Sequence, residues 1–162
     1  MVEKTNVITP AGYSVMAAEY RALFEIERPK LVETISWAAG NGDRSENGDY
    51  IYGRKKLREI DRRLNWLSKR MAAANVVDPA AQPDRGKVWF GATVTIVDED
   101  DRERIVTLVG EDEADASAGR ISWKSPLGRA LKGAVIGDLR SVLLPAGPRE
   151  YEVTAIGYPA AG

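Results

Sequence analysis

Cysteine and histidine are both absent from this chain of 162 residues. Without cysteine the chain can form neither a disulfide nor a thiolate nucleophile, and without histidine it lacks the commonest general base near neutral pH. Serine–histidine and cysteine–histidine catalysis are therefore excluded. A metal ion would need oxygen ligands, which favours Mg²⁺, Ca²⁺ or Mn²⁺ over Zn²⁺.

The sequence also lacks an apolar run near the ~18 residues that a membrane span requires. No basic stretch followed by an apolar stretch stands at its start, so we expect no secretion signal and a cytoplasmic location. Hydrophobic residues make up 44% and charged residues 29%, which is a globular rather than a disordered composition. The length suits one ordinary domain or two small ones.

Residues 10–75 have the periodicity of amphipathic helices, with turn residues at 40–49 between two runs. Thr9 and Pro10 suit the start of the first helix, and Pro29 should kink or restart it. Gly53 falls on the apolar seam and should cost about 1 kcal/mol relative to Ala. Spacings of three and four join Tyr13, Met16, Tyr20, Leu23, Leu31, Ile35 and Ala38, and then Tyr50, Leu57, Ile60, Leu64, Leu67 and Met71. We therefore predict an antiparallel helical hairpin.

The second half of the chain changes to β-strand patterning. We expect strands at 88–97, 104–109, 120–123, 138–144 and 149–156. A short helix should begin with Ser125 as N-cap and Pro126 at the first helical position, and end at Gly133. The predicted fold class is α+β: a coiled-coil hairpin over 1–78 with its tip near 41–49, a linker over 79–86, and a small antiparallel sheet with one short helix over 87–162.

Three acids are spaced by three residues at the tip: Asp43, Glu46 and Asp49. If the tip is helical, they share one face and repel each other. A hard cation such as Mg²⁺ could offset that repulsion, because it prefers oxygen ligands. Alternatively, these acids only favour the N-terminus of the following helix and form an ordinary turn.

Basic charge is concentrated in residues 54–70, which contain eight Lys and Arg residues and only two acidic residues, Glu59 and Asp61. With Leu57 and Leu64 at heptad position a, the pairs 55/56, 62/63 and 69/70 fall at f and g and form one ridge. Such a ridge suits a phosphate backbone, although a solvated coiled-coil face is the alternative. The eight residues are Arg54, Lys55, Lys56, Arg58, Arg62, Arg63, Lys69 and Arg70.

Three motifs resemble the Gre family of bacterial transcript cleavage factors. They are the tip sequence at 42–50, the Glu-Arg-Pro triplet at 27–29, and the C-terminal stretch at 125–131 followed by 135–138. They occur in family order, and the resemblance runs from about Thr9 to Tyr158. Arg44 and the segment 57–63 are more similar to the GreB branch than to the GreA branch.

The resemblance implies an FKBP-like C-terminal domain and action on backtracked bacterial RNA polymerase. The coiled coil would enter the polymerase's secondary channel, where Asp43 and Glu46 help to hold its second Mg²⁺ and position the attacking water. Asp49 would be a weaker participant, and Ser45 and Asn47 would shape the tip. The basic ridge would contact the extruded 3′ end of the nascent RNA, and the residues of the docking loop would bind the polymerase: Lys124, Ser125 and Pro126.

The resemblance further implies a monomer that binds no Mg²⁺ stably alone and is not itself an enzyme. Three positions depart from the family pattern: Gly48 replaces a usual Ala, Gly53 should loosen the second helix, and Lys124 replaces a short acidic or amide residue.

Other functions stay open on the sequence alone. A channel binder that inhibits without cleavage would share this fold, and a regulator of nucleoside diphosphate kinase would have a shorter hairpin. A general nucleic-acid-binding coiled coil would not depend on Asp43 or Glu46. An FKBP-like domain also suggests prolyl isomerase activity, but the sequence shows no set of aromatic residues that would form such a pocket.

Overall fold

The structure is a computed structural model that describes residues 4–40 and 47–161. It divides into two compact units, a helical hairpin over 13–74 and a sheet unit made of 5–12 and 75–162. Residues 5–12 thus belong to the sheet unit, whereas the sequence predicted a hairpin over the whole of 1–78. Over the ranges that the structure describes, none of the helices has the length and apolarity that a membrane span needs.

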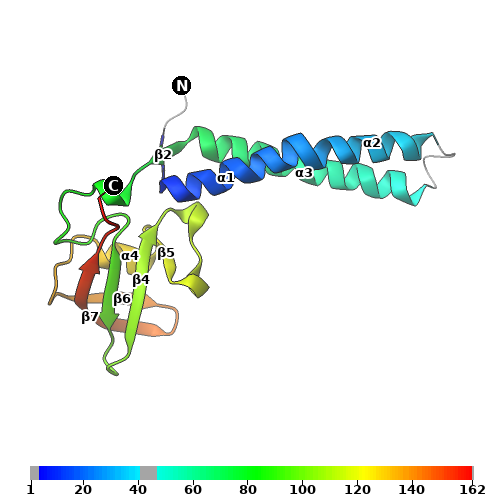
Figure 1. Ribbon diagram of the computed structural model, residues 1–162. Helices are drawn as coiled ribbons and strands as arrows, with labels where there is room; N and C mark the ends of the chain where they lie inside the picture. The colour runs from blue at the N-terminus through cyan, green and yellow to red at the C-terminus, as the bar shows by residue number, and fades with distance from the viewer. Residues whose placement is uncertain (1–3, 41–46, 162) are drawn as a thin grey trace. The chain divides into compact units, whose positions relative to one another are not determined.

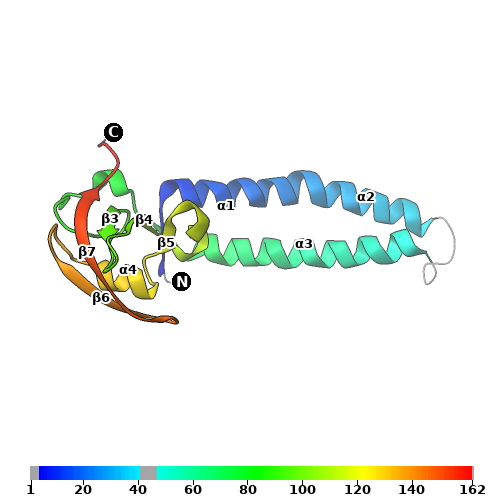
Figure 2. The same cartoon turned by 90° about the horizontal axis from the view of Figure 1, so that it is seen from below.

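The hairpin is built from α1 (Pro10–Ala22), the π-helical turn η1 (Leu23–Glu27), α2 (Arg28–Ala39) and α3 (Gly48–Ala72). Figures 1 and 2 show α2 and α3 running side by side, which confirms the predicted hairpin. The effect expected of Pro29 takes the form of the π-helical turn directly before it. Proline lacks an N–H and its ring displaces the carbonyl four residues earlier, so the helix widens without ending.

The seam between the helices is closely packed at Gly53. Ile60, Leu64 and Leu67 are buried as the periodicity predicts, and so is Ala38 on α2. A Cβ atom added to Gly53 would lie 2.7 Å from Cγ1 of Ile35. Gly53 therefore lets α3 approach α2 closely, which corrects the expectation that this glycine only loosens the helix.

The sheet unit contains five strands: β3 (Thr93–Val97), β4 (Glu103–Val109), β5 (Arg120–Ser122), β6 (Leu139–Leu144) and β7 (Gly147–Gly157). Their order is β5-β4-β3-β7-β6. The pairing is antiparallel except that β5 runs parallel to β4, so the prediction of a wholly antiparallel sheet is wrong. The connection over 110–119 returns the chain before β5 begins, and strand patterning carries no signal for that direction.

The first strand is shorter than the sequence predicts, because residues 88–92 lie outside any strand, with a turn at 90–91, and β3 begins only at Thr93. Gly91 has φ +88°, and a Cβ atom there would lie 2.4 Å from Cβ of Pro79. This close approach requires glycine, and it bends the chain out of the strand conformation. Val88 is still buried in the core of this unit, so its apolar character reflects packing and not strand periodicity.

The core of the sheet unit lies between the sheet and α4 (Pro126–Leu131). Inward-facing strand residues such as Val94, Val106 and Val153 are fully buried, as is Leu131 of the helix. Ser125 caps α4 as predicted, since its Oγ accepts a hydrogen bond from N of Gly128 at 3.1 Å. Gly133, with φ +78°, follows the end of the helix.

The N-terminal segment is fastened to the sheet unit through an acidic 3₁₀ turn. Thr9 caps α1 as expected, because Gly12 N donates to its Oγ1 at 3.1 Å. In turn, Thr9 N and Gly110 N both donate to Oε2 of Glu113, at 2.8 and 2.9 Å. The buried Asn6 donates to Oδ2 of Asp112 at 2.8 Å. These long-range bonds were not predicted from the sequence.

The segment predicted as a linker, 79–86, is ordered against the sheet unit. The short strands β1 (Asn6–Ile8) and β2 (Ala74–Val76) form a two-stranded sheet just before it. Residues Pro79–Ala81 form a 3₁₀ turn, and Arg85 donates to the carbonyls of Ala80 and Pro159 at 2.6 and 2.9 Å. Proline content alone indicated a linker, but these tertiary contacts hold the segment in place.

Replacing Gly53 by alanine should destabilise the hairpin, although alanine is the better helix former. The new methyl group would overlap Ile35, and overpacking of this kind costs about 1–3 kcal/mol. Thermal unfolding followed by circular dichroism should show a lower Tm for G53A. The matched control is G48A, because a Cβ at Gly48 meets nothing within 4 Å. Equal stability of G53A and G48A would contradict this account of the seam.

Candidate functional site

The described end of the hairpin is organised by Asn47. Its Oδ1 accepts a hydrogen bond from N of Tyr50 at 3.2 Å and so caps α3, while its Nδ2 donates to the carbonyl of Ala38 at 2.7 Å. One side chain thus joins the last turn of α2 to the first turn of α3. Asp49 lies in that first turn and is exposed. The other tip residues that the sequence singles out lie outside the described residues: Asp43, Ser45 and Glu46.

A metal centre is not assembled by the described residues alone, among which no three acidic side chains come together as ligands. Asp49 is the one candidate acid with a described position, and it is exposed at the start of α3. A single exposed carboxylate is a poor Mg²⁺ site, because Mg²⁺ requires several oxygen ligands in near-octahedral geometry.

Three of the eight basic side chains on α3 are held by contacts within the hairpin. Arg63 makes a two-point ion pair with Glu19, with Nε–Oε2 at 2.5 Å and Nη2–Oε1 at 2.9 Å. The same guanidinium lies 4.5 Å from the ring centroid of Trp66. Arg54 donates to the hydroxyl of Tyr50 at 3.1 Å. The third, Lys56, is 3.9 Å from Glu59 one turn later.

Four other basic side chains, spaced along α3, form what we call the outer basic stripe, and one of them, Arg58, also borders a groove that α3 forms with α2. Their spacings of three, four and seven place them on one side of the helix, and all four are exposed. Within the described part of the chain they make no ion pair. Apart from the half-buried Arg70, the predicted ridge therefore divides into side chains that join the hairpin and the outer basic stripe, which is Lys55, Arg58, Arg62 and Lys69.

The predicted docking loop is tied into the sheet unit. Lys124 Nζ lies 3.5 Å from Oε1 of Glu111 and its backbone N donates to Oγ of Ser122 at 3.2 Å. Ser125 has a structural role as the N-cap of α4, while Pro126 is exposed. A cavity of about 320 Å³ is bordered by Ser125, Pro126 and the strand residues beside them.

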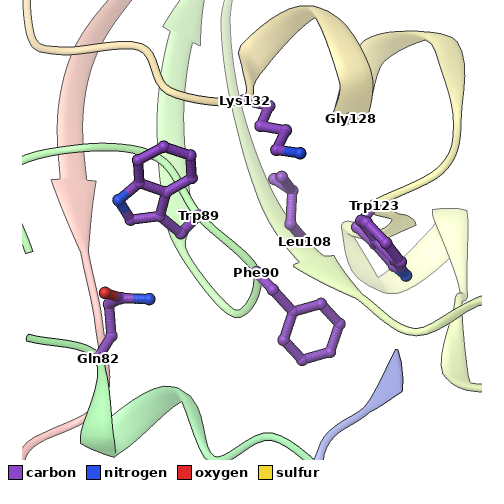
Figure 3. A pocket seen from close by; sticks show the side chains of 7 residues that line it. All are labelled: Gln82, Trp89, Phe90, Leu108, Trp123, Gly128 and Lys132. Carbon is purple, nitrogen blue, oxygen red and sulfur yellow. The ribbon is translucent and has the colours of Figure 1, made fainter. Parts of the chain in front are cut away.

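An aromatic pocket of about 310 Å³ lies elsewhere on the sheet unit. Figure 3 shows Trp89 and Trp123 on opposite sides of it, with Phe90 and Leu108 between them. The rings of Phe90 and Trp123 meet edge to face, with centroids 6.2 Å apart. The structure thus corrects the expectation that this domain has no aromatic pocket. Trp123 is more than thirty positions from Trp89 and Phe90 in sequence, so only the fold brings these rings together.

Comparison with known proteins decides the family. A model described as "Transcription elongation factor, N-terminal" matches residues 6–76, and one described as "Transcription elongation factor, GreA/GreB, C-term" matches 82–158. The chain is 48% identical over 156 residues to transcription elongation factor GreB of Neisseria meningitidis serogroup B, which covers 96% of each protein. This chain belongs to the GreA/GreB family of transcription elongation factors.

A second GreB protein agrees with this family assignment. GreB of Yersinia pestis is 44% identical over 155 residues, which cover 96% of this chain and 90% of that protein. Among solved structures, Gfh1 of Thermus thermophilus is 23% identical with a TM-score of 0.43, over 94% of this chain and 98% of that one. A GreA/GreB elongation factor from Nitrosomonas europaea is 31% identical with a TM-score of 0.42, over 59% and 79%.

Removing the Asn47 side chain should loosen the end of the hairpin. Asn47→Ala loses both the cap on α3 and the bond to Ala38, and the loss of an N-cap costs about 0.5–2 kcal/mol. Asn47→Asp keeps the accepting oxygen and should lose only the bond to Ala38. Hydrogen exchange should therefore accelerate at residues 37–40 in both variants, and at the start of α3 in the alanine variant alone. Unchanged exchange in N47A would contradict the assigned contacts.

The ion pair across the hairpin should make a small, pH-dependent contribution to stability. The hydrogen bond from Arg63 holds the pKa of Glu19 below its ordinary value, against the opposing effect of partial burial. A depressed folded-state pKa stabilises the fold above the unfolded pKa, and this gain is lost as the pH falls through the folded value. Because the pair is largely exposed, Glu19→Gln should lower the free energy of unfolding by under about 1 kcal/mol at pH 7.

Chemical denaturation across pH measures this contribution. At a pH low enough to protonate Glu19 in the folded protein, the wild-type and E19Q proteins should unfold at the same denaturant concentration, because the charge of the ion pair is then lost. A difference that persists unchanged at low pH would show that Glu19 acts through packing and not through its charge.

Proposed function

We propose that this protein binds bacterial RNA polymerase and places its helical hairpin in the secondary channel. There it stimulates the polymerase's intrinsic, Mg²⁺-dependent cleavage of the 3′ end of backtracked RNA, and so rescues arrested complexes. The observation that carries the proposal is that the acidic sequence 43–49 falls in the sequence at the junction of α2 and α3, the two helices of the hairpin, in a chain similar to GreB along 96% of its length. With 25 residues at 1.5 Å each, α3 alone is about 37 Å long, long enough to reach into a deep channel.

The chemistry at the tip requires only oxygen ligands, which the sequence supplies without histidine or cysteine. Asp43 and Glu46 would help to hold a Mg²⁺ ion that the polymerase mainly binds, and such an ion would supply activation of water and stabilisation of the leaving oxygen. Asp49, placed in the first turn of α3, would act through its charge at a greater distance. Asn47 would hold the tip residues in position, because it fixes the ends of both helices. The protein would accordingly not be an enzyme by itself.

The outer basic stripe is the part of the hairpin best suited to contact the extruded RNA. Its four cations are exposed and have no internal partners within the described residues, so phosphates can approach them without breaking an ion pair. Arg63 is less suited, because its guanidinium is already bound to Glu19 and stacked on Trp66. Binding through the stripe should weaken with salt, as it does wherever phosphates are neutralised by Lys and Arg.

The sheet unit would dock on the polymerase through Lys124, Ser125 and Pro126. Ser125 holds this loop at the start of α4. The ion pair with Glu111 positions Lys124, the residue that departs from the family pattern. The same proposal includes three further points: the sheet unit is FKBP-like, the protein is a monomer, and it acts in the cytoplasm.

Transcript cleavage by purified backtracked elongation complexes, in the presence of Mg²⁺, tests the proposal. The wild-type protein should release 3′ RNA fragments, while Asp43→Ala and Glu46→Ala should reduce the cleavage rate by about 10²-fold or more, as loss of a group that stabilises a transition state does. Asp49→Ala should have a smaller effect. Protein incubated with RNA alone should cleave nothing.

Binding of each variant to the polymerase is the necessary control, because the tip substitutions should leave affinity nearly unchanged. If the wild-type protein binds the polymerase but leaves the transcript intact, the protein instead occupies the channel as an inhibitor. If cleavage is stimulated equally by D43A and E46A, the tip acids are not the functional groups.

A further inference from the structure

Two large aromatic side chains are exposed near the described end of the hairpin. Trp37 on α2 and Tyr52 on α3 each expose 67% of their surface. Neither ring is part of the seam, and neither takes part in the chemistry proposed for the tip. Exposed aromatic rings of this size commonly mark a surface that a partner covers.

The packing of the seam places both rings on the same side of the hairpin. Ala38 and Gly53 are buried and so face the opposite helix. Trp37 comes one residue before Ala38, and Tyr52 comes one residue before Gly53. In two antiparallel helices whose seams face each other, residues one position before the seam project to the same side, because both helices are right-handed.

The opposite side of the hairpin agrees with this placement. A groove there is lined by Val32 and Ser36 of α2 together with Arg54, Arg58 and Asp61 of α3. On α3, Tyr52 and Arg54 lie about 200° apart around the helix axis, so they cannot share a side. The ion pair of Arg63 with Glu19 lies on the Tyr52 side, because 52, 56, 59 and 63 follow each other at spacings of four, three and four.

Positive charge lies directly beside the rings. Lys55 and Lys56 follow Tyr52 by three and four residues, about one helical turn away. Lys55 is the first residue of the outer basic stripe. Lys56 contacts Glu59, but at the long distance of 3.9 Å. Asp49 precedes Tyr52 by three residues, toward the tip. Along this edge of the hairpin the order is therefore acid, aromatic ring, cation.

We propose that Trp37 and Tyr52 form a stacking platform for bases of the extruded single-stranded RNA, while the outer basic stripe follows the phosphates. This inference rests on the proposed function. Combined aromatic rings and basic side chains are how proteins hold single strands without reading their sequence, because every base has a π-face. An apolar protein surface is a poorer partner, since covering the rings would also remove water from Lys55 without a counter-charge.

For transcript cleavage, the platform would position the extruded RNA along the hairpin. Trp37 precedes Asp43 and Tyr52 follows Glu46 by six residues each in the sequence, so stacking on these rings would hold the RNA segment that passes the hairpin. Both residues act on the RNA substrate and not on the reacting atoms. The platform should favour no base strongly, because stacking does not use hydrogen bonds to base edges.

Backtracked elongation complexes carrying 4-thiouridine in the extruded 3′ segment provide a direct test. On irradiation, wild-type protein should cross-link at or next to Trp37 and Tyr52. Trp37→Ala and Tyr52→Ala should each reduce cross-linking and the cleavage rate by roughly ten-fold at subsaturating protein, which corresponds to the loss of one stacked base. Trp37→Phe and Tyr52→Phe should restore most of both signals, because they keep an aromatic face.

Phe24→Ala serves as the matched control, since Phe24 is an aromatic residue of the same hairpin that is exposed by 53% and lies far from the tip in sequence. Wild-type cross-linking and cleavage rates in W37A and Y52A would overturn the inference and leave the proposed function intact. A loss of binding to complexes without extruded RNA would also overturn it, because the rings would then contact the polymerase. Failure of the wild-type protein to stimulate cleavage would instead contradict the proposed function, and cross-linking would still decide where the RNA lies.

Discussion

Close packing of two antiparallel helices is the constraint on which the functional part of this protein depends. At Gly53 the backbone of α3 approaches Ile35 of α2 so closely that a methyl group has no room. This contact, with Leu64 and Leu67 further along α3, fixes the rotation of each helix about its axis. Among the described residues, this rotation places other side chains of the hairpin in cross-hairpin ion pairs, in the outer basic stripe, or on the edge that carries the exposed aromatic rings.

The division of basic residues follows from that rotation. Arg63 lies beside the seam and forms an ion pair with Glu19 of α1, so its charge is already paired within the protein. Arg28 and Asp61 form the corresponding pair on the other side, at 2.8 Å. The four residues of the outer basic stripe find no acidic partner in the described chain and remain available to phosphates. Basic residues that lie close together in the sequence thus fall into two groups: one group stabilises the hairpin, and the other is placed to bind nucleic acid.

The sheet unit combines local signals with contacts that no local signal shows. Ser125 and Pro126 begin α4 where the capping pattern predicts it, and the strands β6 and β7 form the expected hairpin. By contrast, the parallel pairing of β5 with β4, the anchoring of Thr9 to Glu113 and the aromatic pocket all join residues that are distant in the chain. Each depends on where the chain returns after a connection, which periodicity and composition do not encode.

The sequence by itself determined the α+β class, the helical hairpin, the seam residues, the capping of α1 and α4, and the family, because these rest on spacings and motifs read within a few turns of chain. It also identified Asp43 and Glu46 as candidate acids, which lie outside the described residues and stay a prediction. Only the tertiary structure decided that Gly53 permits close packing, that four of the eight basic residues form one outer stripe, and that Trp37 and Tyr52 share a side. These properties depend on the rotation and approach of neighbouring helices, which side chains distant in sequence fix only when they meet.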